Sequence, residues 1–114
     1  MIQRKKPRWK KRKCEKVIPE EKNIHDNFKI TFIGHATLLI QISGQNILTD
    51  PVWGYRASPF NRAGPHRYVD PGVDFDQLPR IDAILLSHNH YDHMEIATLE
   101  KLHKRDNPTI YTGL

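Results

Sequence analysis

Four side chains that could bind a metal lie within six residues of one another: His88, His90, Asp92 and His93. Imidazole and carboxylate groups are ligands for zinc and for similar borderline divalent ions. The spacing lets His88 and His90 turn toward one ion, and Asp92 and His93 toward a second ion beside it. The alternative is a polar turn in which Asp92 caps a helix, but capping requires neither His88 nor His90. The motif therefore predicts a metal site.

The residues before this motif predict a strand that would position it. Residues 81–86 form a mostly apolar run of strand length, which is typical of a buried strand. The candidate ligands would then leave the end of a rigid strand and enter a loop in which they can converge. After the motif, Met94, Ala97 and residues 99–102 have the spacing of a short amphipathic helix, and Asn107 and Pro108 would end it. Residues 109–111 begin a last strand.

The N-terminal part of the domain is expected to be rich in β-structure. Phe28, Ile30 and Phe32 alternate with polar residues, as in a half-buried strand. Residues 37–42 and 47–49 predict two further strands, joined by a hairpin turn at residues 43–46. Together these strands predict an antiparallel sheet.

Residues 51–80 predict a long loop, because five prolines and three glycines interrupt them. Loops of this length inside a compact domain are usually functional or disordered. The aromatic residues in it argue against disorder, and we expect an ordered loop that lines a substrate groove. The alternative is a loop that only covers the edge of the sheet.

Positive charge is concentrated at the start of the chain. The net charge is +5, but residues 1–16 alone carry +8, which leaves −3 for residues 17–114. We predict a basic, disordered tail and connector over residues 1–27, and a folded domain over residues 28–114. Residues 4–13, with Trp9 among them, could bind an anionic membrane surface or nucleic acid.

The chain contains no apolar run long enough for a membrane span and no secretory signal, and Cys14 is its single cysteine. We therefore expect a cytoplasmic location, with peripheral membrane association as a further option.

The motif resembles the signature of the metallo-β-lactamase superfamily. Other segments resemble its N-acyl-phosphatidylethanolamine phospholipase D branch and the bacterial relatives of that branch. These segments are Ile33-Gly34-His35-Ala36-Thr37, Leu48-Thr49-Asp50-Pro51, Arg56-Ala57-Ser58-Pro59, Ala63-Gly64-Pro65-His66-Arg67-Tyr68 and Leu78-Pro79-Arg80-Ile81-Asp82-Ala83. The likeness runs from about Phe28 to Leu114.

The resemblance implies an α+β fold, the N-terminal half of an αββα sandwich, with a mostly antiparallel sheet. It implies two zinc ions, or other divalent ions, in the intact site, whose remaining ligands would come from a C-terminal half. Asp92 would bind the second ion and orient the nucleophile, which makes it the catalytic candidate. Asp50 would lie near the metals and accept the free N–H of a ligand histidine. His35 is a weaker candidate for the same surroundings.

The activity that the resemblance implies is metal-assisted hydrolysis of a phosphodiester, and specifically of an N-acyl phospholipid. One alternative is a nuclease of the metallo-β-lactamase type, which the basic tail favours and the branch-specific segments disfavour. Another is an inactive, truncated remnant that binds metal weakly or not at all.

Overall fold

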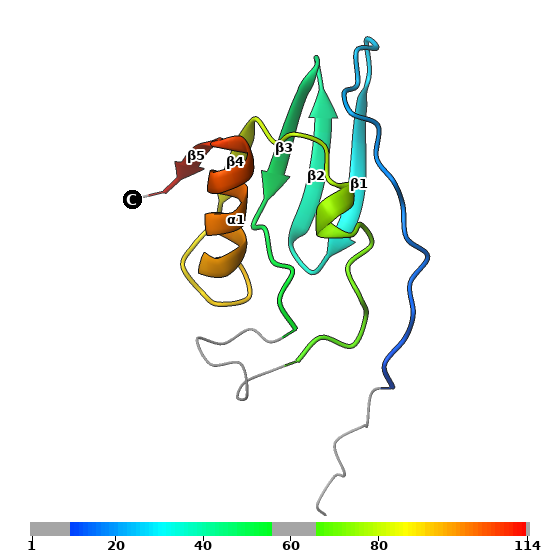
Figure 1. Cartoon of the computed structure of the whole chain (residues 1–114), viewed down its shortest axis with the longest axis vertical. Helices are drawn as coiled ribbons and strands as arrows, with labels where there is room; N and C mark the ends of the chain where they lie inside the picture. The colour runs from blue at the N-terminus through cyan, green and yellow to red at the C-terminus, as the bar shows by residue number, and fades with distance from the viewer. Residues whose placement is uncertain (1–9, 56–65, 114) are drawn as a thin grey trace, which may run out of the picture.

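The computed structural model of the chain describes residues 10–55 and 66–113 (Figure 1). Within these residues, five strands form one sheet in the order β1-β2-β3-β4-β5. The strands are β1 (Phe28–Gly34), β2 (Thr37–Ile42), β3 (Gln45–Thr49), β4 (Ala83–Leu86) and β5 (Thr109–Thr112). A 3-10 helix, η1 (Phe75–Gln77), precedes β4, and the helix α1 (Ile96–Asp106) joins β4 to β5. The predicted α+β class is confirmed.

The sheet is mixed in strand direction. β1, β2 and β3 are antiparallel neighbours, whereas β3 pairs with β4, and β4 with β5, in parallel. The sequence suggested a mostly antiparallel sheet, because only the hairpin between β2 and β3 has a local signature. Parallel neighbours need a crossover connection. α1 provides it between β4 and β5, and the long segment after β3 provides it between β3 and β4.

The core lies between one face of the sheet and α1. Leu39, Leu48 and Ile84 point from the middle strands into this layer, and Leu99 and Leu102 of α1 pack against them. Figure 1 shows α1 lying across β4. The helix ends at Asn107, whose backbone is left-handed and whose N–H donates to the carbonyl of His103 at 3.0 Å. Asn107 and Pro108 thus end the helix as predicted.

β1 is a strand with one buried face, but its alternating apolar residues do not lie on that face. Phe28, Ile30 and Phe32 are 63%, 53% and 65% exposed, whereas Thr31 and Ile33 point into the core. Alternation shows which residues share a face of a strand, but it does not show which face the rest of the chain covers.

The exposed apolar face of β1 continues across the sheet. Residues directly opposite one another on paired strands point to the same side. The register pairs Phe28 with Ile42 and Ile30 with Ile40, and Leu85 with Tyr111 at the other end of the sheet. Ile42, Leu85 and Tyr111 are also exposed. We call this side, defined by Phe28, Ile30, Phe32, Ile42, Leu85 and Tyr111, the open sheet face.

Residues 10–27 run alongside the domain and make hydrogen bonds with it. The side chain of Gln41 donates to the carbonyl of Glu20 at 2.8 Å, and that of Asn46 donates to the carbonyl of Glu21 at 2.7 Å. Asn23 is buried. The domain boundary at residue 28 stays a prediction, and residues 1–9 of the basic tail lie outside the described residues.

The described part of the long loop is fixed to the core through Trp53. Its indole N–H donates to the carbonyl of Val73 at 2.9 Å, and its ring meets that of Phe75 edge to face at 5.6 Å. The resemblance segments at residues 56–59 and 63–65 lie outside the described residues. Among the helices that the structure describes, none has the length and apolar character needed to cross a membrane.

Candidate metal centre

One edge of the sheet collects all the candidate site residues. β3 and β4 are parallel neighbours, so Asp50 after β3 and Ser87 after β4 leave the sheet at the same edge. β1 runs in the same direction as β3, because both are antiparallel to β2. The turn that carries His35 between β1 and β2 therefore lies at this edge too. The sheet topology thus brings together three segments that are far apart in the sequence.

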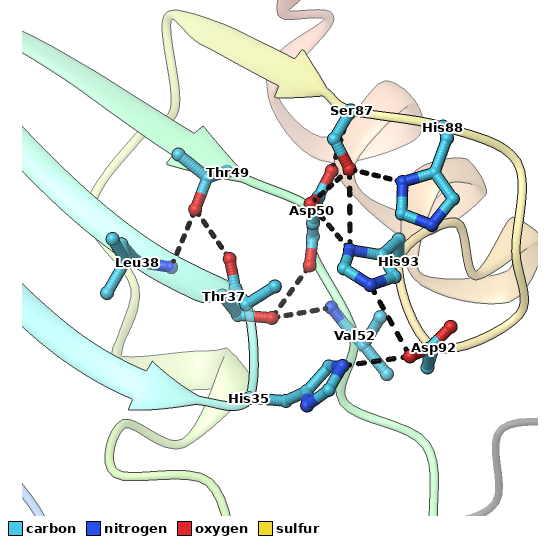
Figure 2. Close-up of polar contacts among 11 residues, drawn as sticks. His35, Thr37, Leu38, Thr49, Asp50, Val52, Ser87, His88, Asp92 and His93 are labelled. Carbon is cyan, nitrogen blue, oxygen red and sulfur yellow. Dashed lines mark hydrogen bonds and ion pairs between the residues drawn. The ribbon is translucent and has the colours of Figure 1, made fainter.

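Asp50 contacts residues from several parts of the site, as Figure 2 shows. Its carboxylate accepts the backbone N–H of Ser87 at 2.7 Å and the Ser87 hydroxyl at 2.7 Å. The same carboxylate lies 2.8 Å from Nδ1 of His93. The hydroxyl of Thr37 donates to the Asp50 carbonyl at 2.7 Å. Asp50 therefore connects the end of β3 to the loop that carries the histidines.

The hydrogen bonds also determine the charge state of Asp50. Burial by itself would raise the pKa of this carboxyl group. The hydrogen bonds from His93 and Ser87 outweigh it, and the pKa of Asp50 lies below its ordinary value. Asp50 is thus an anion at neutral pH, and an anion at this position favours the His93 tautomer that carries its proton on Nδ1.

Two sets of three possible ligands meet at Asp92. One set is His88, His90 and Asp92, and the other is His35, Asp92 and His93. In each set one ligand atom per residue lies within 4.8 Å of the others. The His88 ring is 4.6 Å from the His90 ring and 4.0 Å from the His93 ring, between centroids. Partial desolvation by itself would raise the pKa of Asp92. The hydrogen bond from His35 and the charges of the histidines have the opposite and larger effect, so the pKa of Asp92 lies below its ordinary value.

The structure places every residue that the sequence singled out for this site. His88, His90, Asp92 and His93 converge, and Asp50 lies directly behind His93. His35, the weaker candidate, directly contacts the cluster: its Nε2 lies 2.9 Å from Oδ2 of Asp92 (Figure 2). The roles of these residues as metal ligands stay predictions. The donors are imidazoles and carboxylates whose ligand atoms lie close together in each set, and this chemistry fits zinc and related divalent ions.

Three supporting residues were missed from the sequence. Ser87 stands directly before the motif, and that position was the available signal for it. Thr37 and Glu95 had no such signal, because Thr37 bonds to Asp50 and Glu95 bonds to Trp53, and both partners are distant in the sequence. Thr37 contacts Asp50, and the Glu95 carboxylate accepts the N–H of Trp53 at 2.9 Å and the hydroxyl of Thr98. Glu95 thereby joins the segment after β3 to the start of α1.

A groove of about 930 Å³ opens beside the metal-ligand candidates. His35, His90 and Asp92 are among the residues that line it. Its remaining walls are largely aromatic or aliphatic, and they include Phe32, Val52, Tyr55, Tyr68, Val69 and Tyr91. The half-buried Arg67 donates to the carbonyl groups of Val52 at 3.0 Å and Gly54 at 3.3 Å, which fixes one wall to the segment after β3. Val52, Tyr55 and Arg67 of the predicted loop thus line a groove beside the candidate ligands.

Comparison with known proteins agrees with this arrangement. The family described as "Beta-lactamase superfamily domain" matches residues 45–113, which is more than half of the chain. An N-acyl-phosphatidylethanolamine-hydrolyzing phospholipase D of Caenorhabditis elegans is 42% identical over 72 residues, which is 63% of this chain and 20% of that protein. A metal-dependent hydrolase of Exiguobacterium is 38% identical over 81 residues, which is 71% of this chain and 30% of that protein.

A solved structure supports the fold. The isothiocyanate hydrolase from Delia radicum gut bacteria superposes with a TM-score of 0.56 at 33% sequence identity, covering 73% of this chain and 33% of that chain. The matched segments therefore span between a fifth and a third of the lengths of these three proteins. The family match, the mixed sheet with its helix, and the histidine–aspartate cluster at the sheet edge agree with one another. The chain belongs to the β-lactamase superfamily, in its metallo-β-lactamase group of metal-dependent hydrolases.

Proposed function

We propose that this chain carries the metal-binding part of a zinc-dependent phosphodiesterase of the phospholipase D type that acts on N-acyl phospholipids. The observation that supports the proposal best is the meeting of two donor sets at Asp92, which also lines a groove with largely apolar walls. The similarity to an N-acyl-phosphatidylethanolamine-hydrolyzing phospholipase D supports the choice of substrate class.

The chain would supply positioned ligands for two ions. His88 and His90 would hold one, His93 the other, and Asp92 lies between the two sets. Divalent ions at such a site lower the pKa of a bound water toward about 7 and neutralise charge that develops on a phosphoryl oxygen. Asp50 engages Nδ1 of His93, so that Nε2 faces Asp92, and Ser87 fixes Asp50 in turn. Asp92 would also orient the nucleophilic water, since its carboxylate faces both donor sets.

The groove suits a substrate that has both an apolar part and an anionic part. Tyr55, Tyr68 and Tyr91 provide surfaces for a hydrocarbon chain, while the phosphodiester would lie beside His90 and Asp92. Burial of apolar surface is favourable by about 25 cal/mol per Å², so an acyl chain in this groove would contribute to binding. A small polar phosphodiester would lack that contribution.

The basic segment lies beside residues that line the same groove, which supports an anionic membrane surface as a partner. The N–H of Arg12 donates to the carbonyl of Tyr68 at 2.8 Å, and the N–H of Val17 donates to that of Gly72 at 2.8 Å. These bonds hold residues 10–17 beside residues 68–72. Lys10, Arg12 and Lys13 are exposed there, as is Ile18 at 75%. Basic residues near an anionic bilayer contribute about 1 kcal/mol each. We propose a cytoplasmic, peripheral location on this basis.

Hydrolysis assays would test the activity. The zinc-loaded chain would be assayed alone and together with the C-terminal part of a homologous phospholipase D supplied in trans. The substrates would be an N-acyl phosphatidylethanolamine, a chromogenic phosphodiester, single-stranded DNA and an aryl isothiocyanate. We expect chelator-sensitive hydrolysis of the N-acyl phospholipid in the complemented sample. Preferential cleavage of DNA would favour a nuclease, and inactivity toward every substrate together with no zinc binding would favour an inactive remnant.

Vesicle sedimentation would test the membrane partner. The chain should pellet with vesicles of phosphatidylcholine and phosphatidylserine but not with phosphatidylcholine alone. The triple variant Lys10→Glu, Arg12→Glu, Lys13→Glu should lose this binding. A control with the same change of charge, Lys22→Glu, Arg80→Glu and Lys104→Glu, should retain it, because those three exposed residues lie away from the groove. Equal loss in both triple variants would show that only net charge matters.

A further inference from the structure

We infer that Arg67 binds the phosphodiester anion of the substrate in the groove. The inference rests on the proposed function, because it names the residue that would recognise the anionic part of the proposed substrate. Arg67 lines the same groove as His90 and Asp92. Arginine suits phosphate groups, because its guanidinium is planar, permanently charged and more weakly hydrated than the ammonium group of lysine.

Hydrogen bonds to the backbone hold the guanidinium of Arg67 in place. Its Nε donates to the carbonyl of Gly54 at 3.3 Å, and its Nη2 donates to the carbonyl of Val52 at 3.0 Å. The backbone N–H of Arg67 donates to the carbonyl of Tyr55 at 2.8 Å. A guanidinium carries five N–H groups, and Nη1 makes no hydrogen bond with the described part of the chain. The side chain is therefore positioned in advance, with donors left for an oxyanion.

Nη1 of Arg67 lies beside the end of β1 that reaches the site. A Cβ atom added to Gly34 would stand 3.2 Å from Nη1, so glycine at this position leaves room for the guanidinium. The next residue in the chain is His35, whose Nε2 lies 2.9 Å from Oδ2 of Asp92. All four residues line the groove. The guanidinium thus adjoins the backbone one residue before His35, on the side of the domain that carries the candidate ligands.

The protein balances the charge of Arg67 incompletely. None of the ion pairs between described residues includes Arg67. Burial lowers the pKa of Arg67, and the negative charges of Glu95 and Asp70 offset this only in part, so the pKa lies below its ordinary value. Arginine stays protonated at neutral pH all the same. A half-buried cation in such surroundings is stabilised by an anion, and the phosphodiester is the anionic group of the proposed substrate.

Two ligands that differ by one charge would separate anion binding from support of the groove wall. One is N-hexanoyl-dihexanoylphosphatidylethanolamine, a phosphodiester, and the other is its methyl phosphotriester, which is neutral. Both would be titrated calorimetrically into the metal-free chain with a chelator present, below the concentrations at which they form micelles. We expect the wild-type chain to bind the diester about 10-fold or more tightly than the triester, as for a hydrogen bond to a charged group. Added salt should reduce this preference.

Variants would assign the preference to Arg67. In Arg67→Gln the affinity for the diester should fall by about 10-fold or more, whereas the affinity for the neutral triester should change little. Arg67→Lys keeps the charge and should keep part of the preference. Arg80→Gln removes an exposed arginine outside the groove, and this matched control should bind both ligands as the wild type does. Thermal unfolding would show that each variant remains folded.

Two results would overturn the inference. Equal loss of affinity for both ligands in Arg67→Gln would show that Arg67 only supports the wall of the groove. Equal affinity of the wild-type chain for the two ligands, or no measurable binding of the diester, would exclude an anion site whether or not a variant folds. The titrations contain no metal, so they are independent of hydrolysis. A charge preference that depends on Arg67, together with an inactive complemented enzyme, would contradict the proposed function and leave the anion site standing.

Discussion

Nδ1 of His93 lies 2.8 Å from Oδ2 of Asp50, and this pair determines which nitrogen of His93 faces the site. Asp50 is nearly buried, and Ser87 holds it through two further hydrogen bonds. An anionic carboxylate in this position accepts a hydrogen bond from the N–H at Nδ1. Nε2 of His93 is then the nitrogen turned toward Asp92. A residue at the end of one strand thus orients a candidate ligand that follows the next strand in the sheet.

The first prediction is that Asp50→Ala weakens zinc binding at the ion held by His93 by about 10- to 100-fold, which is the usual cost of losing such a partner. Asp50→Asn should weaken it similarly, because an amide cannot accept from His93 and from both Ser87 donors as a carboxylate does. Isothermal titration with zinc would measure this. Asp26→Asn, at the opposite end of the sheet, is the control and should bind normally. Wild-type affinity in Asp50→Ala would contradict this role.

The second prediction concerns stability at acid pH. The pKa of Asp50 is lower in the folded chain than its ordinary value. Its contribution to stability should therefore be fully present above about pH 4, the ordinary pKa of aspartate, and should be lost as the pH falls through the lower folded value. Chemical denaturation of the metal-free chain between roughly pH 2 and pH 7 would measure it. Asp50→Asn should flatten this acid limb. Parallel profiles for wild type and variant would show that the Asp50 shift is absent.

The third prediction is that Asp92 affects both ions, because it belongs to both donor sets. Asp92→Ala should reduce zinc binding at both sites, whereas His88→Ala should reduce it mainly at one. In the complemented enzyme either change should lower kcat by on the order of 100-fold or more, the upper end of what even an outer-shell loss costs. Zinc stoichiometry and steady-state kinetics would be measured together. If Asp92→Ala kept wild-type zinc affinity at one of the two sites, Asp92 would not be a ligand shared by both ions.

The fourth prediction is that the 114-residue chain by itself shows little or no phosphodiesterase turnover. Most of the described ligand cluster is solvent-accessible, and catalysis requires two ions in a fixed, correctly charged arrangement. The assay is the hydrolysis of the chromogenic phosphodiester with zinc, with and without a chelator. Robust, chelator-sensitive turnover by the isolated chain would mean that its own residues, or those of a second copy, complete the centre.

The fifth prediction is that the open sheet face causes the isolated chain to self-associate. Phe28, Ile30 and Phe32 on this face are each more than half exposed, and contiguous apolar surface of this kind promotes association. Size-exclusion chromatography with light scattering should show species larger than a monomer. The double variant Phe28→Ser, Ile30→Lys should shift them toward the monomer. Ile96→Lys, which removes an exposed isoleucine from α1, should not. A monodisperse wild-type monomer would contradict the prediction.

The local features of this protein were determined by the sequence. The apolar run before Ser87 predicted a buried strand, and β4 lies there, although only Ile84 of its four residues is buried and Leu85 is exposed. Asn107 and Pro108 predicted the end of α1. The close spacing of His88, His90, Asp92 and His93 required them to be near one another in almost any fold, because residues a few positions apart in a loop cannot separate far. These predictions succeed because each depends on neighbours in the chain.

Only the tertiary structure decided what depends on distant pairing. The alternation in β1 identified two faces, yet it could not show that Thr31 and Ile33, rather than Phe28, Ile30 and Phe32, would face the core. The choice depends on where α1 and the long loop pack. Resemblance suggested that Asp50 and His35 lie near the site, but their contacts with His93 and Asp92 arise from the sheet, which places the ends of β1, β3 and β4 at one edge. The helix between β4 and β5 had a local signature, but the pairing of β3 with β4 across the long loop had none, so the geometry of the site came from the fold.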